Sequence, residues 1–193
     1  ELIESYFRKY RSRSCERTFV NVFLWSRHYK VTFAEIEHTI VFKSEDHGLA
    51  FAYPVGAAED VKRVLEFLME YSAKKEAPFV LYNVTEDNFR QLEEWYPGQY
   101  QIEYNRDIAD YVYESEKLAT LSGKKLHAKR NHINKFKATF DDWCYEPITK
   151  ENVEECFQMA LKWRNESGCE EDVEKNAEMC VTLNSLRLFE ELE

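Results

Sequence analysis

One amphipathic stretch limits the folds open to this chain more than any other feature. Across residues 59–75, apolar side chains recur with the 3.6-residue period of a helix, which predicts one buried face. The residues on that face are Val61, Val64, Leu65, Leu68 and Tyr71 or Ser72. A strand pattern precedes the stretch at 49–53, and a continuous apolar run at 79–84, after Pro78, predicts a buried strand. A helix between two strands requires a layer of helix packed on a sheet.

The other elements follow from the same periodicities. Helices are expected over 1–11 and 18–29, from Thr85 to Pro97, through the basic segment near 124–137, from Thr149, and from 172 to the end. Strands are expected over 31–36, 39–43, 49–53, 79–84, 100–105, 111–113 and 143–148. Only 5 Gly and 4 Pro favour long regular elements, and 44% hydrophobic residues can fill a core. The sequence therefore predicts an α/β or α+β fold, a mixed sheet flanked by helices.

Positive charge is concentrated in one short segment. Residues 124–137 contain six Lys or Arg and no Asp or Glu, whereas the whole chain has 26 basic and 36 acidic residues. The remainder therefore carries 20 basic against 36 acidic residues, and a net charge of -10 argues against broad coating of nucleic acid. A cationic helix on an acidic protein predicts a local site for an anionic ligand. The candidate residues are Lys124, Lys125, His127, Lys129, Arg130, Asn131 and Lys135.

Two interpretations of these cations are open. On one continuous helix, a single arc holds Leu118, Leu126, Ile133, Phe136 and Phe140. Lys129 falls inside that arc and Arg130 at its edge, so they would contact a phosphate or carboxylate in a cleft between two domains. Alternatively, their stems cover apolar surface while their charged ends pair with the chain's own carboxylates.

Other chemistry is poorly supported. His127 and His132 are five residues apart, which does not suit a shared metal ion, although either is a conceivable general base. The five cysteines, with no CxxC spacing, predict reduced thiols in a cytoplasmic protein and no metal site; Cys156 lies on an apolar helical stripe. Hydrolase, zinc-protease, P-loop and dinucleotide motifs are absent, as are a signal peptide and a membrane-spanning run.

The chain resembles the phosphatidylglycerol lysyltransferase C-terminal family in several stretches: CERTFVNVFLWSRHYKV, YNRDIADYVYESEKLATLSGKKLHAKRNHINKFK, YEPIT and ALKWR. That family has two tandem GNAT-type acyltransferase domains and is loosely similar to Fem-type aminoacyltransferases. The resemblance implies a GNAT-like domain over 1–110. It also implies that 111–193 holds a basic linking helix and the start of a second GNAT-like domain, whose remainder these residues lack.

The resemblance also implies a function. It suggests transfer of an acyl or aminoacyl group from coenzyme A or aminoacyl-tRNA to an amine, hydroxyl or lipid acceptor. The alternative is a non-catalytic module that keeps the fold and binds RNA or a phospholipid headgroup. The GNAT phosphate loop corresponds to residues 53–58, where Gly56 and Ala58 match and the leading Gln or Arg does not. Because Glu59 and Asp60 would repel an anion there, Gly56, Ala57 and Ala58 form the weaker cofactor candidate, and no catalytic residue is assigned.

Overall fold

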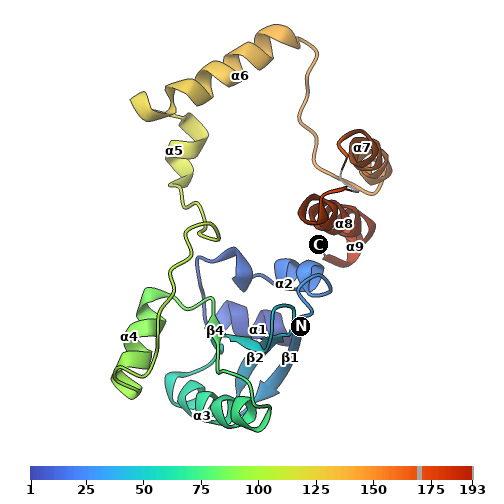
Figure 1. The fold of residues 1–193 in the computed structure, drawn as a ribbon. Coiled ribbons are helices and arrows are strands. Elements are labelled where there is room, and N and C mark those ends of the chain that lie inside the picture. Colours follow the sequence, from blue (N-terminus) through green and yellow to red (C-terminus); the bar gives the residue numbers. More distant parts are fainter. Residues whose placement is uncertain (169–170, 193) are drawn as a thin grey trace. The chain divides into compact units, whose positions relative to one another are not determined.

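The structure is a computed structural model that describes residues 1–168 and 171–192 (Figure 1). It divides into two compact units. The first unit combines Glu1–Tyr104 with Glu154–Glu193, and the second unit is Asn105–Val153. Each unit has its own internal contacts, and they are described in turn.

A four-stranded sheet lies at the centre of the first unit, in the order β1-β2-β3-β4. The strands are β1 (Thr32–Ile36), β2 (Thr39–Ser44), β3 (Ala50–Ala52) and β4 (Leu81–Tyr82). β1, β2 and β3 pair antiparallel, and β3 and β4 pair in parallel. Glu37 and His38 form the tight turn between β1 and β2 with φ values of 44° and 59°, the left-handed geometry that matches the twist of a hairpin. The mixed α/β fold and the first three strands are confirmed.

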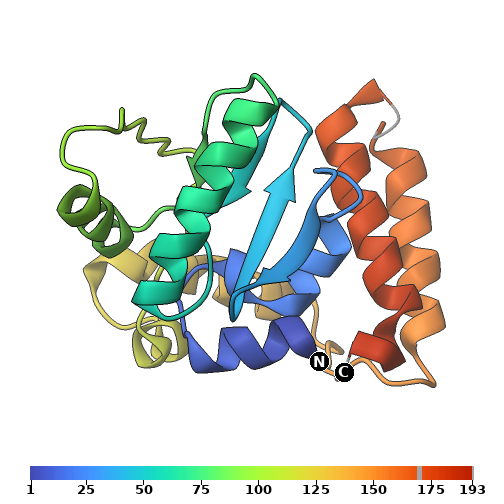
Figure 2. The ribbon, with the colours of Figure 1, turned by 90° about the horizontal axis from the view of Figure 1, so that it is seen from below.

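Helices cover both faces of this sheet (Figure 2). Along β2, Ile40 and Phe42 belong to a core cluster with Ile3 and Phe7 of α1 (Leu2–Lys9). Val41 points to the other face, where it packs with side chains of α3. On α3 (Ala58–Lys74) the buried residues are Val61, Val64, Leu65, Leu68 and Ser72, which is the face that the periodicity predicts.

Local sequence signals set the ends of several helices. Thr85 and Asn88 form a reciprocal capping box at the start of α4 (Glu86–Trp95), as the cap position predicts. The side chain of Asp172 caps α8 (Val173–Arg187). The remaining helical segments are η1 (Cys15–Arg17), α2 (Phe19–Trp25), α5 (Ser115–Thr120), η2 (Lys124–Leu126), α6 (His127–Thr139), α7 (Val153–Glu166) and α9 (Phe189–Leu192).

The apolar helical stripe that the sequence predicts around Cys156 is confirmed. Ala160 of α7 is buried in a cluster with Met179 and Leu183 of α8, and Phe157 and Leu161 pack against that cluster. Cys156 is half-buried on the same helix, while Cys169 lies outside the described residues. The helix itself begins at Val153 rather than beside Thr149.

Four predicted strands are wrong or much shorter than expected. Residues 100–105, 111–113 and 143–148 have no strand structure, and the run 79–84 contains a strand only at Leu81–Tyr82. In the three segments without strand structure most side chains are open to solvent: Tyr104 is 76%, Tyr111 88% and Tyr145 85% exposed. The physical reason is that a strand needs a hydrogen-bonded neighbour, and the described residues supply none for 100–105, 111–113 and 143–148.

The expectation of one continuous helix through Leu118 and Phe140 is also wrong. Leu121 and Gly123 adopt φ values of 50° and 91°, which end α5 and separate it from η2. Leu118 therefore belongs to α5, and Phe140 is an extended residue after α6. The arc drawn across these two residues does not exist as a single helical face.

The two faces of α3 provide a test of the core. Leu65 is 0% exposed, whereas Phe67 on the same helix is 50% exposed. We expect Leu65→Ala to lower the free energy of unfolding by about 2–5 kcal/mol, because it leaves a cavity. Phe67→Ala, the control, should change that free energy much less. Urea denaturation of each variant measures both values, and equal losses would contradict the assigned orientation of α3.

Candidate functional site

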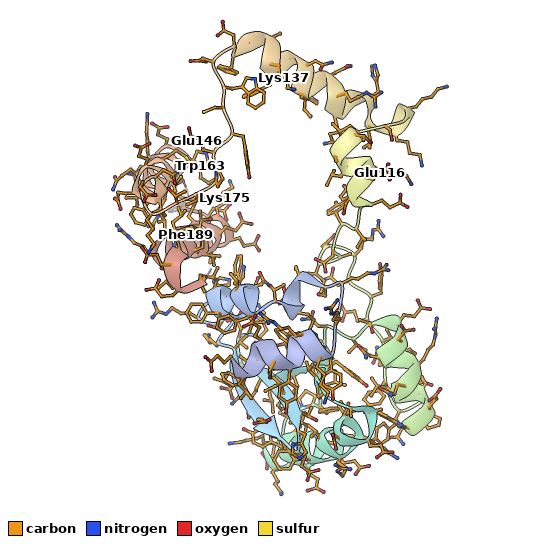
Figure 3. All side chains as sticks on the ribbon, turned by 180° about the vertical axis from the view of Figure 1, so that it is seen from behind. Glu116, Lys137, Glu146, Trp163, Lys175 and Phe189 are labelled. Carbon is orange, nitrogen blue, oxygen red and sulfur yellow. The ribbon has the colours of Figure 1, made fainter. Side chains whose placement is uncertain are left out.

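The cationic segment folds into a short 3-10 turn followed by a helix. Lys124 and Lys125 lie in η2, and the other candidates lie on α6, the helix on which Figure 3 labels Lys137. Gly123 begins the segment with a left-handed φ of 91°, a conformation that side-chain-bearing residues seldom adopt. Lys137 lies in the last turn of α6, where a positive charge complements the helix dipole. The structure thus places the predicted anion-binding residues in one continuous stretch.

Four lysines of this stretch are open to solvent and have no carboxylate partner in the described part of the chain. Lys124, Lys125, Lys129 and Lys135 are exposed, and within residues 1–168 and 171–192 none of them lies within ion-pair distance of a carboxylate. Lysines elsewhere behave differently: Nζ of Lys30 lies 3.4 Å from Asp46, and Nζ of Lys175 lies 3.4 Å from Asp172. Uncompensated ammonium groups on one short segment form a cationic surface that can attract phosphate.

Arg130 has a different role from its neighbours. Its guanidinium donates hydrogen bonds to the carbonyl of Leu121 and, at 3.0 Å, to the carbonyl of Gly123. Both carbonyls belong to the turn between α5 and η2, so Arg130 holds that turn against α6. It positions the cationic stretch and has fewer donors left for a ligand than the lysines have.

The polar candidates on α6 contact each other. Nδ2 of Asn131 lies 3.3 Å from Nδ1 of His127, so Asn131 donates to the ring when the imidazole proton is on Nε2. His127 and His132 are exposed, and in the described part of the chain neither is oriented by a carboxylate. Without such a partner the ring tautomer and orientation are not fixed, so a general-base role for either histidine stays a prediction.

An aromatic cluster lies at the carboxyl end of α6. The ring centroids of Phe136 and Phe140 are 5.1 Å apart, and those of Phe136 and Trp143 are 6.1 Å apart. Nζ of Lys137 lies 5.4 Å from the Trp143 ring centroid, within the range of a cation–π interaction. Lys137 is therefore partly engaged by the protein itself.

Gly56, in the loop before α3, has a packing role. A Cβ at this position would lie 2.6 Å from Oγ1 of Thr39 and 3.2 Å from the carbonyl oxygen of His38. Backbone hydrogen bonds of 3.0 and 2.9 Å between Ile40 and Val55 hold the loop against β2. This close approach accounts for the glycine that matches the phosphate-loop pattern, and no ligand is needed to explain it.

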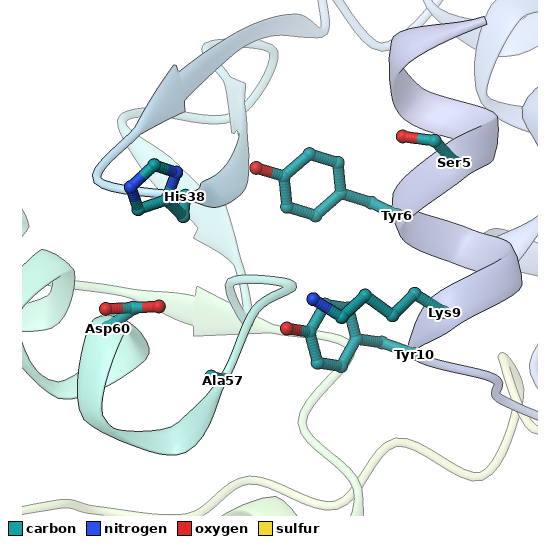
Figure 4. Close-up of a pocket in the computed structure, with 7 residues that line it drawn as sticks. All are labelled: Ser5, Tyr6, Lys9, Tyr10, His38, Ala57 and Asp60. Atoms are coloured by element: carbon teal, nitrogen blue, oxygen red, sulfur yellow. The ribbon is translucent and has the colours of Figure 1, made fainter.

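A cavity of about 400 Å³ adjoins this loop (Figure 4). Its lining residues are Ser5, Tyr6, Lys9, Tyr10, His38, Ala57 and Asp60. The Tyr6 hydroxyl donates to a Glu35 carboxylate oxygen at 2.5 Å. Burial, and then that hydrogen bond, raise the pKa of Tyr6 to about 12, so the phenol stays neutral. Among the described residues that line this cavity Lys9 is the one lysine or arginine, and Asp60 lies on its wall, so the cavity is poorly suited to a pyrophosphate.

A second cavity, of about 600 Å³, contains arginines that were not among the sequence-predicted site residues. Arg8, Arg11 and Arg17 line it, and the Arg17 guanidinium donates to the Tyr53 carbonyl at 3.0 Å. Burial lowers the pKa of Arg17, although a guanidinium remains charged near neutral pH. The signal was present in the sequence, because residues 8–17 contain five basic residues and one Glu.

The described residues form neither a metal-binding cluster nor a helix that could span a membrane. Residues 1–168 and 171–192 contain no group of three His, Cys, Asp or Glu side chains arranged to hold a metal ion. Within the same ranges, each helix is too short or too polar to cross a bilayer.

Comparison with known proteins identifies the family. The family model described as phosphatidylglycerol lysyltransferase, C-terminal, matches residues 7–193. The chain belongs to this family. The resemblance in the basic segment is therefore confirmed for nearly the whole chain.

Two relatives of this family member carry no assigned activity. A conserved protein of unknown function from Bacteroides thetaiotaomicron VPI-5482 has a crystal structure that matches with a TM-score of 0.90 and 34% identity, covering 99% of this chain and 64% of that one. An uncharacterised protein of Mycoplasmoides gallisepticum is 30% identical over 90 residues, which are 46% of this chain and 29% of the relative. The chain thus spans less than two thirds of either relative's length.

The packing of Gly56 provides one test of the loop before α3. We expect Gly56→Ala to lower the free energy of unfolding by about 1–3 kcal/mol, because the new methyl group meets Thr39. In a Thr39→Ala background the Thr39 hydroxyl is absent, so Gly56→Ala should lower the free energy of unfolding by a smaller amount. Urea denaturation of the four proteins gives the coupling free energy. Strictly additive losses would show that the contact does not explain the glycine.

The neighbours Arg130 and Lys129 form a matched pair for the cationic segment. Arg130→Ala should weaken the turn at 121–123 by about 1 kcal/mol, a roughly fivefold rise in local amide exchange, because two carbonyls are deprived of a charged donor. Lys129→Ala removes the same charge but no hydrogen bond to that turn, so exchange should not change. Hydrogen exchange read by mass spectrometry compares them, and identical profiles would refute the positioning role.

Proposed function

We propose that this chain is part of an acyltransferase or aminoacyltransferase that moves an acyl or aminoacyl group from coenzyme A or aminoacyl-tRNA to an amine, hydroxyl or lipid acceptor. The observation that supports this most is a set of four exposed lysines on η2 and α6, which form no ion pair with a carboxylate among the described residues. The chain that carries them belongs to the phosphatidylglycerol lysyltransferase C-terminal family. Both donors carry several phosphates, and lysine ammonium groups are strong, salt-sensitive phosphate ligands.

Charge segregation supports a localised contact with the donor. Outside 124–137 the chain has 20 basic and 36 acidic residues, which repel a polyanion from most of the surface. A donor would therefore approach through the cationic segment in a limited range of orientations. Binding of this kind contributes to catalysis by placing the activated ester or thioester close to the acceptor.

The reaction itself is an acyl substitution. The acceptor nitrogen or oxygen attacks the carbonyl carbon and forms a new amide or ester bond. The bond from that carbon to the tRNA oxygen or the coenzyme A sulfur breaks, and the proton that the acceptor loses is balanced by the one that the leaving hydroxyl or thiol gains. Hydrogen-bond donors directed at the carbonyl oxygen would stabilise the transition state. We assign no residue of this chain to the bond-breaking step, and its part is to bind and orient the donor.

A second candidate function is a non-catalytic module that binds RNA or a phospholipid headgroup. The packed loop at Gly56 favours it, because that loop is held against β2 and is followed by two acidic residues, Glu59 and Asp60. The first unit then contributes fold without a phosphate loop, and the cationic segment would bind an anion without transfer.

The test compares two fourfold lysine-to-alanine variants with equal changes of net charge. One removes Lys124, Lys125, Lys129 and Lys135; the control removes Lys30, Lys74, Lys162 and Lys175, each of which pairs with a carboxylate elsewhere. Fluorescence anisotropy with labelled tRNA and calorimetry with coenzyme A measure affinity at several salt concentrations. We expect the first variant to weaken binding about 10- to 100-fold. Its slope of log affinity against log salt should be shallower by up to about 0.9 for each phosphate that the protein no longer neutralises.

The control variant should bind nearly as tightly as the wild type. Equal weakening in both variants would show that net charge, and not the segment, governs binding. Transfer of labelled amino acid from aminoacyl-tRNA, or of an acyl group from acyl-coenzyme A, to added amines and lipids then separates the two functions. Tight binding without transfer by the full-length protein would favour the binding module.

A further inference from the structure

The cavity beside Arg17 shares no lining residue with the cationic segment or with the loop at Gly56. It has a volume of about 600 Å³ and lies within the first unit, where α1, η1, α2 and α9 supply lining residues. Cavities of roughly 300–1,000 Å³ are typical of small-molecule sites in proteins. The lining has an apolar part and a basic part, and together they decide which kind of molecule fits.

The apolar part of the lining comes from α1, α2 and α9. Phe7 is 7% exposed and belongs to the core cluster that contains Ile40 and Phe42, and Phe19 packs against the same cluster. Val20 and Leu192 extend this apolar lining. A ligand that packs here gains stability by removing its own apolar area from water.

Arg17 supplies a half-buried guanidinium that lacks a carboxylate partner. Its Nη2 donates to the Tyr53 carbonyl at 3.0 Å, and within residues 1–168 and 171–192 no carboxylate oxygen lies within ion-pair distance of it. The guanidinium loses solvation at this position, and burial accordingly lowers the pKa of Arg17. A guanidinium has five N–H donors, so one bond to a carbonyl leaves donors for a further acceptor.

The other two arginines of the cavity differ in their partners. Arg8 forms an ion pair with Glu4, one turn away on α1. Arg11 is exposed and forms no ion pair with a carboxylate in the described part of the chain. Arg11 and Arg17 are therefore the two cations of this cavity whose charge the described residues leave uncompensated.

Acidic side chains limit the charge that the cavity accepts. Glu1 and Glu191 also line it, and both are exposed to solvent, whereas Arg17 is half-buried. Because these carboxylates repel a polyanion, coenzyme A and tRNA are poor ligands for this cavity. A single carboxylate matches the planar fork of a guanidinium and brings only one negative charge.

We propose that this cavity is a binding site for a small organic acid, a molecule with one carboxylate on an apolar body. The carboxylate accepts hydrogen bonds from Arg17 and Arg11, and the apolar body packs on Phe7 and Phe19. The site shares no residue with the proposed donor contact on η2 and α6, so either proposal can fail without the other.

Octanoate tests the proposal, with two molecules of the same chain length as controls. Calorimetry on the full-length protein measures the binding of octanoate, of uncharged 1-octanol and of cationic octylamine. We expect octanoate to bind saturably and at least about 10-fold more tightly than either control, because only its carboxylate accepts hydrogen bonds from the guanidinium groups. Absence of saturable octanoate binding, or equal affinity for the three molecules, overturns the proposal.

Two neighbouring arginines provide the matched variants. Arg11 and Arg13 are both exposed, and of these two Arg11 is the one that lines the cavity. Arg11→Gln should weaken octanoate binding about 10-fold, whereas Arg13→Gln, which removes the same charge, should leave it unchanged. Arg17 is less suitable because it also holds the Tyr53 carbonyl, so its replacement would disturb the fold. Equal affinities in the two variants would contradict a site at Arg11.

The fourfold lysine variant of η2 and α6 separates this site from the proposed donor contact. It should bind octanoate as tightly as the wild type, whether or not the wild type binds tRNA. Loss of octanoate binding in that variant would assign the acid to the cationic segment and overturn the proposal. Displacement of octanoate by an equal concentration of inorganic phosphate would also overturn it, because the cavity would then select phosphate rather than a carboxylate on an apolar body.

Discussion

The fold of the first unit depends on the burial of β2 on both faces. Ile40 and Phe42 face the cluster with α1 while Val41 faces α3, so consecutive residues of one strand join two separate cores. Thr39, which begins the strand, is also fully buried. The loop at Gly56 passes within contact distance of this strand, so a Cβ at Gly56 would lie 2.6 Å from Oγ1 of Thr39.

The second unit differs from the first in that its side chains are not buried. Its helices carry the concentrated positive charge and a cluster of exposed aromatic rings, and no residue in it is buried. Hydrophobic stabilisation scales with the apolar area removed from water, and the helices of this unit remove little of it.

Two neighbouring cations of α6 have different contacts and therefore different roles. Lys129 and Arg130 are adjacent and equally charged, yet Arg130 directs its donors to the turn at Leu121 and Gly123, while Lys129 makes no ion pair with any described residue. A planar guanidinium with several donors suits a pair of carbonyls, and a flexible ammonium suits a mobile phosphate. Residue type alone could not have distinguished the two, because both were equally plausible ligands of an anion.

The sequence by itself determined the amphipathic face of α3, the first three strands, the cap at Thr85, the stripe on α7 and the family. These features arise from contacts within a few residues or from a periodic burial pattern, both of which are local. Only the tertiary structure decided that residues 100–105, 111–113 and 143–148 are not strands here, that Leu121 and Gly123 interrupt the basic helix, and that Arg8, Arg11 and Arg17 share a cavity. Each of these depends on which distant residues come into contact, since a strand without a partner has nowhere to place its backbone hydrogen bonds.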